Sequence, residues 1–331
     1  MGIHILQVFQ QQQKMCGRCL TRLLMIQLRN RQFLSNSAAS PVYHLKSRGL
    51  IKVQGQDTVP FLQGLVTNDV SLLGSEVRSQ YSMLLNVQGR VICDLMLYTA
   101  SVVQGQESTV LMECDRTLME QVISTLKKYK IRRKVSVEDI CGSHRVLSSC
   151  DPAVSIVPGG EAITVTDPRV PAFGSRIIIN NDSPIEIDIS EDERGYHERR
   201  LQWGIPEGVH DLPPGSALPL EGNLVYMNGV SFSKGCYLGQ ELTARTHHTG
   251  VTRKRLMPVV FDRDPGSIEP GQDILNASTK SVGKFRSVIG QYGIGLMRVA
   301  EISGELTLAN KSGETIYLNA VKPNWWPNEG V

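Results

Sequence analysis

Residues 234–241 of the 331-residue chain read Lys234-Gly235-Cys236-Tyr237-Leu238-Gly239-Gln240-Glu241. Gly235 and Gly239 let the backbone turn tightly around the cysteine and leave its sulfur atom uncovered. A cationic neighbour such as Lys234 favours thiolate over thiol, and thiolate is the form that binds metal or attacks an electrophile. The pattern therefore predicts a functional thiol at Cys236. The spacing alone leaves a second interpretation open, a buried structural cysteine on a tight turn.

One cysteine is too few ligands for a zinc ion or an iron–sulfur cluster, since these take about four nitrogen or sulfur ligands. The missing ligands must come from elsewhere in the fold, from glutathione or from a second protein. His247 and His248 are candidates, but neighbours in a strand point to opposite faces, so at most one could join Cys236. Imidazoles that face solvent or pack in the core are the alternative. Beyond residue 40 the sequence has no CxxC pair, and it contains no Walker loop, HExxH or GxSxG motif.

The composition, 41% hydrophobic and 20% charged residues, is that of an ordinary globular protein of two or three domains. The sequence has no apolar run of 18 or more residues, so we expect no transmembrane segment. The first 40 residues hold no acid and five of the 35 basic residues, which leaves 30 positive against 32 negative charges for the rest. Residues 41–331 therefore have a net charge of −2, and this charge does not indicate the basic surface of a nucleic-acid-binding protein.

The positive charge lies at the front of the chain. On a helical wheel Arg18, Arg22 and Arg29 share one side, and most leucines of residues 20–28 lie across from them. An amphipathic, Arg-bearing, acid-free leader followed by Ser35-Asn36-Ser37 is the mitochondrial pattern. We therefore predict a transit peptide over residues 1–40 and a location in the mitochondrial matrix; a merely disordered tail is the alternative.

Seven cysteines without a repeated spacing are expected to be thiols in a reducing matrix. Cys16 and Cys19 fall in the predicted leader and cannot support a metal site in the mature protein. Four others lie in or beside apolar stretches and are interpreted as small core residues: Cys93, Cys114, Cys141 and Cys150.

The apolar pattern between the leader and residue 255 predicts a mixture of strands and helices. Helices are expected after the capping residues Asp57, with Pro60 in its first turn, and Asp115, and again over residues 194–202. The expected strands are 49–53, 81–85, 91–98 and 110–113, of which the middle two flank the turn 86–90.

From Met257 onward, short strands follow one another, separated by Gly, Pro, Asn and Asp. Such a run predicts a compact β-barrel. We therefore predict an α+β protein with three parts: a transit peptide (1–40), a mixed region of two interleaved subdomains (41–255) and a C-terminal barrel domain (256–331).

Four segments of the sequence resemble one protein family. The motif 234–241, followed by Ala244-Arg245-Thr246-His247-His248, is similar to the signature of the YgfZ-type folate-binding proteins, and more narrowly of their mitochondrial branch, the iron–sulfur cluster assembly factors. The similarity runs from about Tyr43 to the C-terminus. Its other segments, in matching order, are 61–69, 85–91 and 203–207.

The resemblance implies the fold of the aminomethyltransferase (T protein) of the glycine cleavage system, with mixed domains around a central cleft and a C-terminal barrel. It also implies that the protein acts together with A-type carrier proteins in the maturation of [4Fe–4S] clusters. Cys236 would ligate a [2Fe–2S] cluster shared with the carrier, which supplies the missing thiolates. The other residues of the implied cluster motif are Lys234, Gly235, Tyr237, Gly239, Gln240, Glu241 and Arg245.

The sequence departs from the transferase in its implied folate cleft, which consists of Asn86, Asp94 and Gln202. The transferase has two adjacent acids where this chain has Cys93-Asp94, and a Glu that contacts the pterin where Gln202 aligns. An amide cannot make the charge-assisted hydrogen bond of a carboxylate. Aminomethyl transfer is therefore not expected, whereas tetrahydrofolate binding is left open.

Three functions follow from these residues. The first is an assembly factor without classical turnover and without catalytic residues. The second is a tetrahydrofolate-dependent one-carbon transferase with Asp94 as its acid. The third is a thiol enzyme in which His247 or His248 serves as the base for Cys236.

Overall fold

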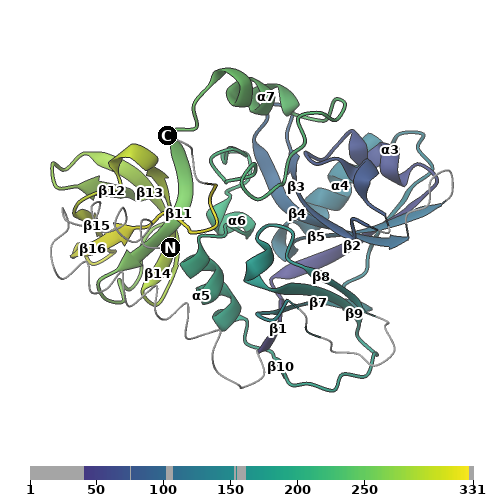
Figure 1. Ribbon diagram of the computed structural model, residues 1–331, viewed down its shortest axis with the longest axis horizontal. Helices are drawn as coiled ribbons and strands as arrows, with labels where there is room; N and C mark the ends of the chain where they lie inside the picture. Colours follow the sequence, from purple (N-terminus) through teal and green to yellow (C-terminus); the bar gives the residue numbers. More distant parts are fainter. Residues whose placement is uncertain (1–40, 75, 102–106, 153, 155–161, 328–331) are drawn as a thin grey trace, which may run out of the picture. The chain divides into compact units, whose positions relative to one another are not determined.

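The computed structural model describes residues 41–74, 76–101, 107–152, 154 and 162–327. The described chain contains two five-stranded sheets and a closed barrel (Figure 1). The predicted transit peptide lies outside the described residues. No helix among the described residues is long and apolar enough to span a bilayer.

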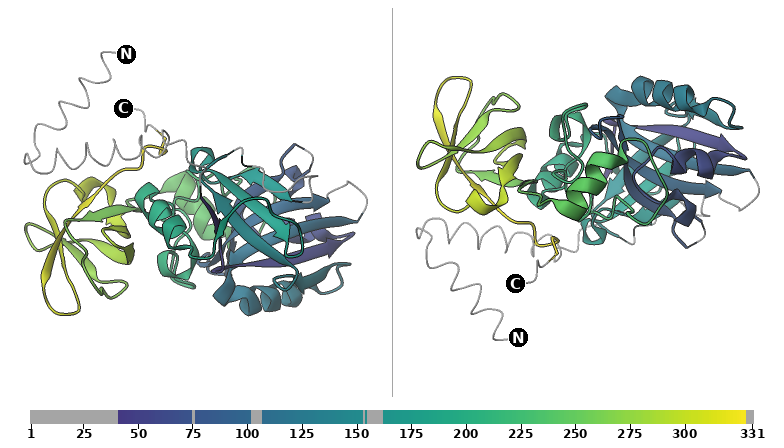
Figure 2. Two further views of the ribbon diagram at one scale, coloured as in Figure 1. Left: turned by 90° about the horizontal axis from the view of Figure 1, so that it is seen from below. Right: turned by 90° about the horizontal axis from the view of Figure 1, so that it is seen from above.

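The first sheet is antiparallel, in the order β3-β4-β5-β2-β6. Alternate residues of a strand face opposite sides of a sheet. Leu95 and Leu97 of β4 therefore pack with helices α3 and α4, which lie against this sheet (Figure 2), while Met96 and Tyr98 enter the core shared with the second sheet. The bounds are β2 Arg48–Gly55, α3 Thr58–Gln63, η1 Val70–Leu72, β3 Ser79–Leu85, β4 Val91–Ser101, β5 Ser108–Asp115, η2 Arg116–Leu118, α4 Met119–Lys130 and β6 Ser136–Asp139.

The second sheet has the order β10-β1-β7-β9-β8. Only its β1–β10 pair is parallel among the described strands. Val146 and Ile178 face the shared core, whereas Leu147 and Ile177 form a small cluster of their own. The bounds are β1 Val42–His44, β7 His144–Ser149, β8 Ile163–Thr166, η3 Pro171–Phe173, β9 Ser175–Asn180 and β10 Ile189–Ser190.

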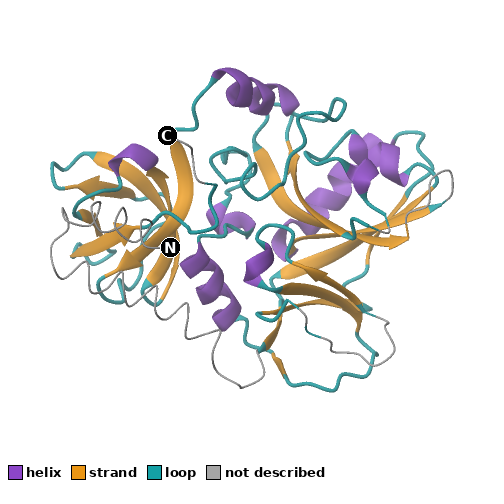
Figure 3. Ribbon diagram, viewed as in Figure 1, coloured by secondary structure: helices purple, strands orange, loops and turns teal. Residues whose placement is uncertain are grey.

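The C-terminal barrel closes in the order β11-β14-β13-β12-β15-β16, so no strand edge is left open (Figure 3). Its interior is a separate apolar core that includes Met257, Phe285 and Met297. The predicted β-barrel is confirmed, although the sequence analysis missed β12. The bounds are β11 Lys254–Phe261, β12 Asp273–Asn276, β13 Ser281–Ile289, β14 Tyr292–Arg298, η4 Val299–Glu301, β15 Leu306–Ala309 and β16 Thr315–Ala320.

Three helices connect the sheets to the barrel: α5 Arg194–Trp203, α6 Gly208–Asp211 and α7 Gln240–Thr249. Helix α5 packs on β14, β13 and β11. It ends at Gly204, whose φ of 66° is left-handed, and a Cβ atom added there would lie 2.4 Å from Cδ of Pro258 in β11. Glycine at 204 therefore lets helix and barrel approach closely.

The elements expected from the sequence are present, with three corrections. His247 and His248 lie in helix α7 and not in a strand. Asp57 precedes α3, but its carboxylate accepts a hydrogen bond from the backbone of Lys134 (2.7 Å) and does not cap the helix. Cys93 and Cys114 are buried as expected, whereas Cys141 and Cys150 are only half-buried.

We expect Gly204→Ala to lower the free energy of unfolding by more than about 2 kcal/mol. The loss has two causes: the strain of a left-handed alanine and the overpacking of its Cβ atom against Pro258. Gly215→Ala is the matched control, since Gly215 also has a left-handed φ (73°) but an added Cβ would meet no described atom within 4 Å. Gly215→Ala should lower the free energy of unfolding by only about 1 kcal/mol. Urea unfolding of both variants measures the difference, and equal losses would contradict the close approach.

Candidate functional site

Cys236 is exposed, in the loop that leads into α7 (Figure 1). Gly239 ends this loop with a left-handed φ of 75°. A Cβ atom at Gly239 would lie 2.2 Å from the backbone oxygen of Asn86, so only glycine fits there. At Gly235 an added Cβ atom would meet no described atom within 4 Å. Gly239 thus packs the loop against the turn that contains Asn86, while Gly235 leaves open space beside the thiol.

The ammonium group of Lys234 anchors the same loop. Its Nζ donates to the backbone oxygens of Val66 (2.8 Å) and Asn68 (2.6 Å) and lies 5.2 Å from the ring centroid of Tyr237. Burial lowers the pKa of Lys234 to about 8. Within the described chain Lys234 makes no hydrogen bond to the sulfur of Cys236, and the effect of its charge on the thiol stays a prediction. Lys234 therefore holds the Cys236 loop against residues 66–68 through these two hydrogen bonds.

Further backbone contacts hold both ends of the Cys236 loop against residues 64–67. Leu238 N donates to Gly64 O (3.0 Å), and Ser231 N donates to Thr67 O (3.1 Å). The Thr67 hydroxyl donates to Gly229 O (2.7 Å). Two of the segments singled out in the sequence, 61–69 and 234–241, are thus brought together.

The remaining motif residues have distinct surroundings. Gln240 Oε1 accepts a hydrogen bond from Tyr237 N (3.1 Å), which closes the loop on itself. The Tyr237 ring packs in the core shared by the sheets, and burial raises its pKa to about 12. Glu241 and Arg245 form an exposed pair at 3.9 Å on the outer side of α7. Tyr237 and Gln240 shape the loop, whereas Glu241 and Arg245 face solvent beside it.

The two histidines form an aromatic cluster with Phe232, a residue that the sequence analysis did not single out. The Phe232 and His247 rings stack with centroids 3.7 Å apart and an interplanar angle of 7°, and His248 meets both edge-on. Burial and the neighbouring His248 lower the pKa of His247, so its neutral form is favoured. Neither imidazole is hydrogen-bonded to Cys236 in the described part of the chain.

The described residues do not supply a complete metal site. No group of three or more His, Cys, Asp or Glu side chains among them could hold a metal ion. Cys236 therefore offers a single accessible ligand. A cluster that binds at this thiol needs its other ligands from outside the described fold.

A network of buried ion pairs lies between the sheets, and the sequence analysis missed it. Arg48 joins Glu113 (2.7 Å) and Asp94 (3.1 Å). Arg176 joins Glu207 (2.5 Å) and lies 3.5 Å from Glu113. Part of the signal was present in the sequence, since Asp94 and Glu113 interrupt the otherwise apolar runs of β4 and β5. Unpaired, such charges would be too costly to bury, and their pairing is a strong constraint on the fold.

The three residues of the implied folate cleft have separate roles in this structure. Asp94 is 1% exposed, pairs with Arg48 and accepts a hydrogen bond from Gly208 N (3.0 Å). Asn86 Oδ1 accepts from the backbone N–H groups of its own turn. Gln202 lies on α5, the helix that packs on the barrel. No hydrogen bond or ion pair joins these three within the described chain.

A cavity of about 640 Å³ adjoins the C-terminal end of α7 and includes His247 in its lining. Its one carboxylate, Glu301, already pairs with Lys280 (3.2 Å). Its fixed cations come from the residue before β11, from β11, β14 and the segment after β16: Arg253, Arg255, Arg298 and Lys322. The cavity at the C-terminal end of α7 therefore has a basic lining.

The lowered pKa of Lys234 predicts that the stability of the protein depends on pH. The folded-state pKa of about 8 lies below the ordinary 10.5, so between these values the unfolded chain binds more protons and stability rises with pH. We expect the stability difference between wild type and Lys234→Met to grow by about 1 kcal/mol over this window, after a discount for partial exposure. Urea unfolding at several pH values measures it. Lys127→Met is the control, because Lys127 is exposed on α4. A pH-independent difference for Lys234→Met would contradict the lowered pKa of Lys234.

The chain is similar to proteins of one family along most of its length. Residues 253–328 match the family described as CAF17, C-terminal beta-barrel domain. The chain is 41% identical over 312 residues to the mitochondrial iron–sulfur cluster assembly factor IBA57 of Mus musculus, with 88% of this chain and 87% of that protein covered. It is 42% identical over 316 residues to the Homo sapiens protein of the same name, with coverage of 88% and 86%.

A fungal relative and a solved structure extend the comparison. The mitochondrial IBA57 homolog of Mycosarcoma maydis is 32% identical over 337 residues and is covered to 84%. The glycine cleavage system aminomethyltransferase T of Bartonella henselae superposes with a TM-score of 0.68 at 16% identity, over 89% of this chain and 88% of that one. This likeness shows the fold alone, and it confirms the predicted T-protein-like fold class.

Proposed function

The chain belongs to the IBA57 family of mitochondrial iron–sulfur cluster assembly factors, and from this premise we propose that Cys236 holds a [2Fe–2S] cluster jointly with an A-type carrier protein in the matrix. The cluster is cargo in this proposal, passed on during late [4Fe–4S] maturation. The family assignment agrees with the resemblance seen in the sequence. The cluster type, the partner and the role of Cys236 are our own inference.

The single observation that carries the proposal is the exposure of Cys236 on a firmly held loop. Lys234, Leu238 and Gly239 fasten the backbone on both sides of the cysteine, whereas the sulfur itself is free of hydrogen bonds from described residues. A thiol presented in this way loses little conformational entropy when it binds a ligand. It is therefore suited to complete a cluster that another protein already holds.

The number of ligands supports a shared cluster. A [2Fe–2S] cluster takes four ligands, usually cysteine thiolates, and the described residues offer Cys236 without two further potential ligands near it. Histidine replaces cysteine in some [2Fe–2S] centres, so a neutral His247 is chemically competent, although it is stacked on Phe232. The remaining ligands are assigned to the carrier.

The charge around α7 supports a partner that carries an anionic cluster. A [2Fe–2S] core bound by four thiolates has a net negative charge. The ten-residue helix is about 15 Å long, so a protein that reaches Cys236 at its start also approaches the cations around its end. Complementary charge of this kind speeds association and fixes orientation.

The two alternative functions have less support. A transferase would need Asp94 available for substrate, but its carboxylate is buried and engaged by Arg48 and Gly208. A thiol enzyme would need a base in hydrogen-bonding reach of Cys236, and neither His247 nor His248 is so placed within the described chain. Both observations favour the assembly factor.

Cys236→Ser should abolish cluster sharing and leave the fold intact. We expect wild type to develop iron–sulfide absorption bands in the visible spectrum only when it is mixed anaerobically with an A-type carrier, iron and sulfide. After the absorbance of the carrier alone is subtracted, the signal of the variant should be at least about tenfold weaker than that of wild type. Cys150→Ser, a half-buried cysteine elsewhere, is the control and should behave as wild type. Circular dichroism checks that both variants fold; undiminished sharing by Cys236→Ser would disprove the assignment.

A further inference from the structure

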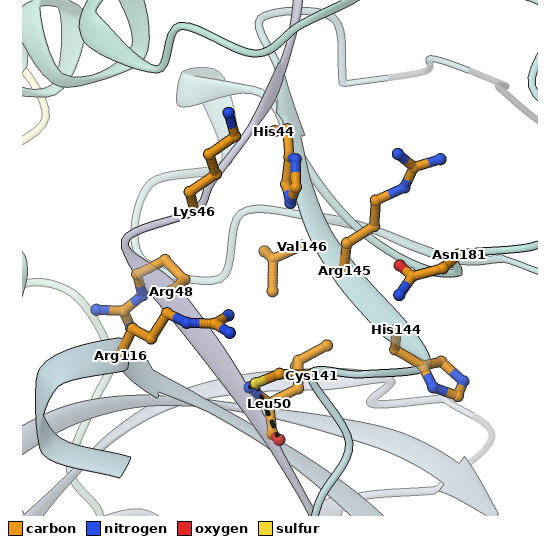
Figure 4. Close-up of a pocket in the computed structure, with 10 residues that line it drawn as sticks. All are labelled: His44, Lys46, Arg48, Leu50, Arg116, Cys141, His144, Arg145, Val146 and Asn181. Atoms are coloured by element: carbon orange, nitrogen blue, oxygen red, sulfur yellow. Dashed lines mark hydrogen bonds between the residues drawn. The ribbon is translucent and has the colours of Figure 1, made fainter.

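A second cavity, of about 340 Å³, lies where β1, β2 and β7 meet the segment after β5 (Figure 4). Every charged side chain in its lining is basic, and no carboxylate is among them. The basic side chains come from three stretches of the chain and are His44, Lys46, Arg48, Arg116, His144 and Arg145. The fold thus gathers basic side chains that are distant in sequence around one cavity.

The backbone places Arg116 and Arg145 on two sides of this cavity. Arg116 N donates to Ser47 O (2.8 Å), which fixes the start of η2 beside the β1–β2 turn. In β7, Val146 faces the shared core, so Arg145 next to it faces the other way. Figure 4 shows the two arginines on opposite sides of Val146, with Cys141 and Leu50 below them.

These two arginines have no counter-ion among the described residues. Neither forms an ion pair there, and the buried Nε of Arg145 has no hydrogen-bond partner. Arg48 differs, because it is paired with Glu113 and Asp94 in the buried network. Clustered cations without acids repel one another, and a bound anion would relieve that repulsion.

The acids nearest the cavity are already engaged. Glu191 pairs with Lys46 (3.0 Å) and His44 (3.1 Å), and these contacts lower its pKa. Asp139 Oδ1 accepts a hydrogen bond from Cys141 N (2.8 Å). Burial and then the charge of Lys52 lower the pKa of His144, which agrees with a positive local potential. The free charge of the cavity is thus positive.

We propose that this cavity binds a small multivalent oxyanion, the phosphate or pyrophosphate group of a small molecule, through Arg116 and Arg145. A guanidinium presents planar, paired donors that match phosphate oxygens, and two of them from different sides can hold one anion. The lining also includes the apolar side chains Leu50 and Val146. The site shares no residue with the Cys236 loop, so it stands independently of the proposed function.

Isothermal titration of the full chain at constant ionic strength tests the site, with inorganic phosphate, pyrophosphate, ADP and chloride as probes. We expect pyrophosphate to bind more tightly than phosphate and chloride to give no signal. Binding of pyrophosphate but not ADP identifies a free anion, whereas binding of both identifies a phosphate group carried by a larger molecule. Arg116→Gln and Arg145→Gln should each weaken pyrophosphate binding about tenfold or more, through loss of charge-assisted hydrogen bonds.

Arg132→Gln and Arg133→Gln are the controls, since both arginines are exposed after α4 and outside the cavity lining. They should bind pyrophosphate as wild type does. Equal weakening by these controls would mean an adventitious ion only and overturn the proposal, as would unchanged binding in the Arg116 and Arg145 variants. If Arg145→Gln fails to fold, the exposed Arg116 decides the outcome alone.

Discussion

Three buried side chains donate hydrogen bonds to one oxygen of Glu207: Arg169 (2.7 Å), Arg176 (2.5 Å) and Tyr196 (2.6 Å). Burial by itself raises the pKa of this carboxyl group, but the surrounding guanidinium groups, Arg176 first, hold it well below its ordinary value. Removing one partner of such a pair typically costs about 3–5 kcal/mol, because the other charge is left buried and alone. This single carboxylate therefore ties α5 to the second sheet through Arg176 of β9, and Arg176 also lies 3.5 Å from Glu113 of the first sheet.

The same constraint extends to the barrel. Beyond Glu207, the first residues of α6 donate backbone hydrogen bonds to Asp94 in β4 and Asp115 in β5. The last residue of α6, Asp211, accepts from Arg200 in α5 and from Ser287 in β13. A continuous set of buried polar contacts thus runs from the first sheet to the barrel. It also engages Asp94, the acid on which one-carbon transfer would have depended.

The Cys236 loop combines a held backbone with a free side chain. Its ends are fastened by Lys234, by the backbone of Leu238 and by the close packing of Gly239 on the turn of Asn86. The sulfur remains exposed, so the thiol on which the proposed function depends is held in a reachable position by an ordered backbone. A complete ligand set on this chain would favour a permanent cluster, whereas one thiol suits transfer.

Much of the fold could be predicted from sequence because its strands are short, largely apolar runs, as in β3 and β4, and its turns carry Gly, Asn and Asp. The thiol was found for the same local reason, a cysteine between two glycines. Long-range contacts could not be foreseen: Lys234 reaches the carbonyl of Asn68, and His247 stacks on Phe232 within a helix. The buried charges were missed because Arg48 and Glu113 meet across β2 and β5, a pairing that local patterns do not specify. The domain boundaries and the roles of the motif residues stay predictions.

Native mass spectrometry of the full chain, mixed anaerobically with an A-type carrier, iron and sulfide, tests the central claim most directly. We expect a complex of both chains that carries one [2Fe–2S] cluster, and its loss when Cys236 is alkylated beforehand. A cluster retained by this chain without the carrier, or a cluster-bearing complex that survives alkylation of Cys236, would contradict the account.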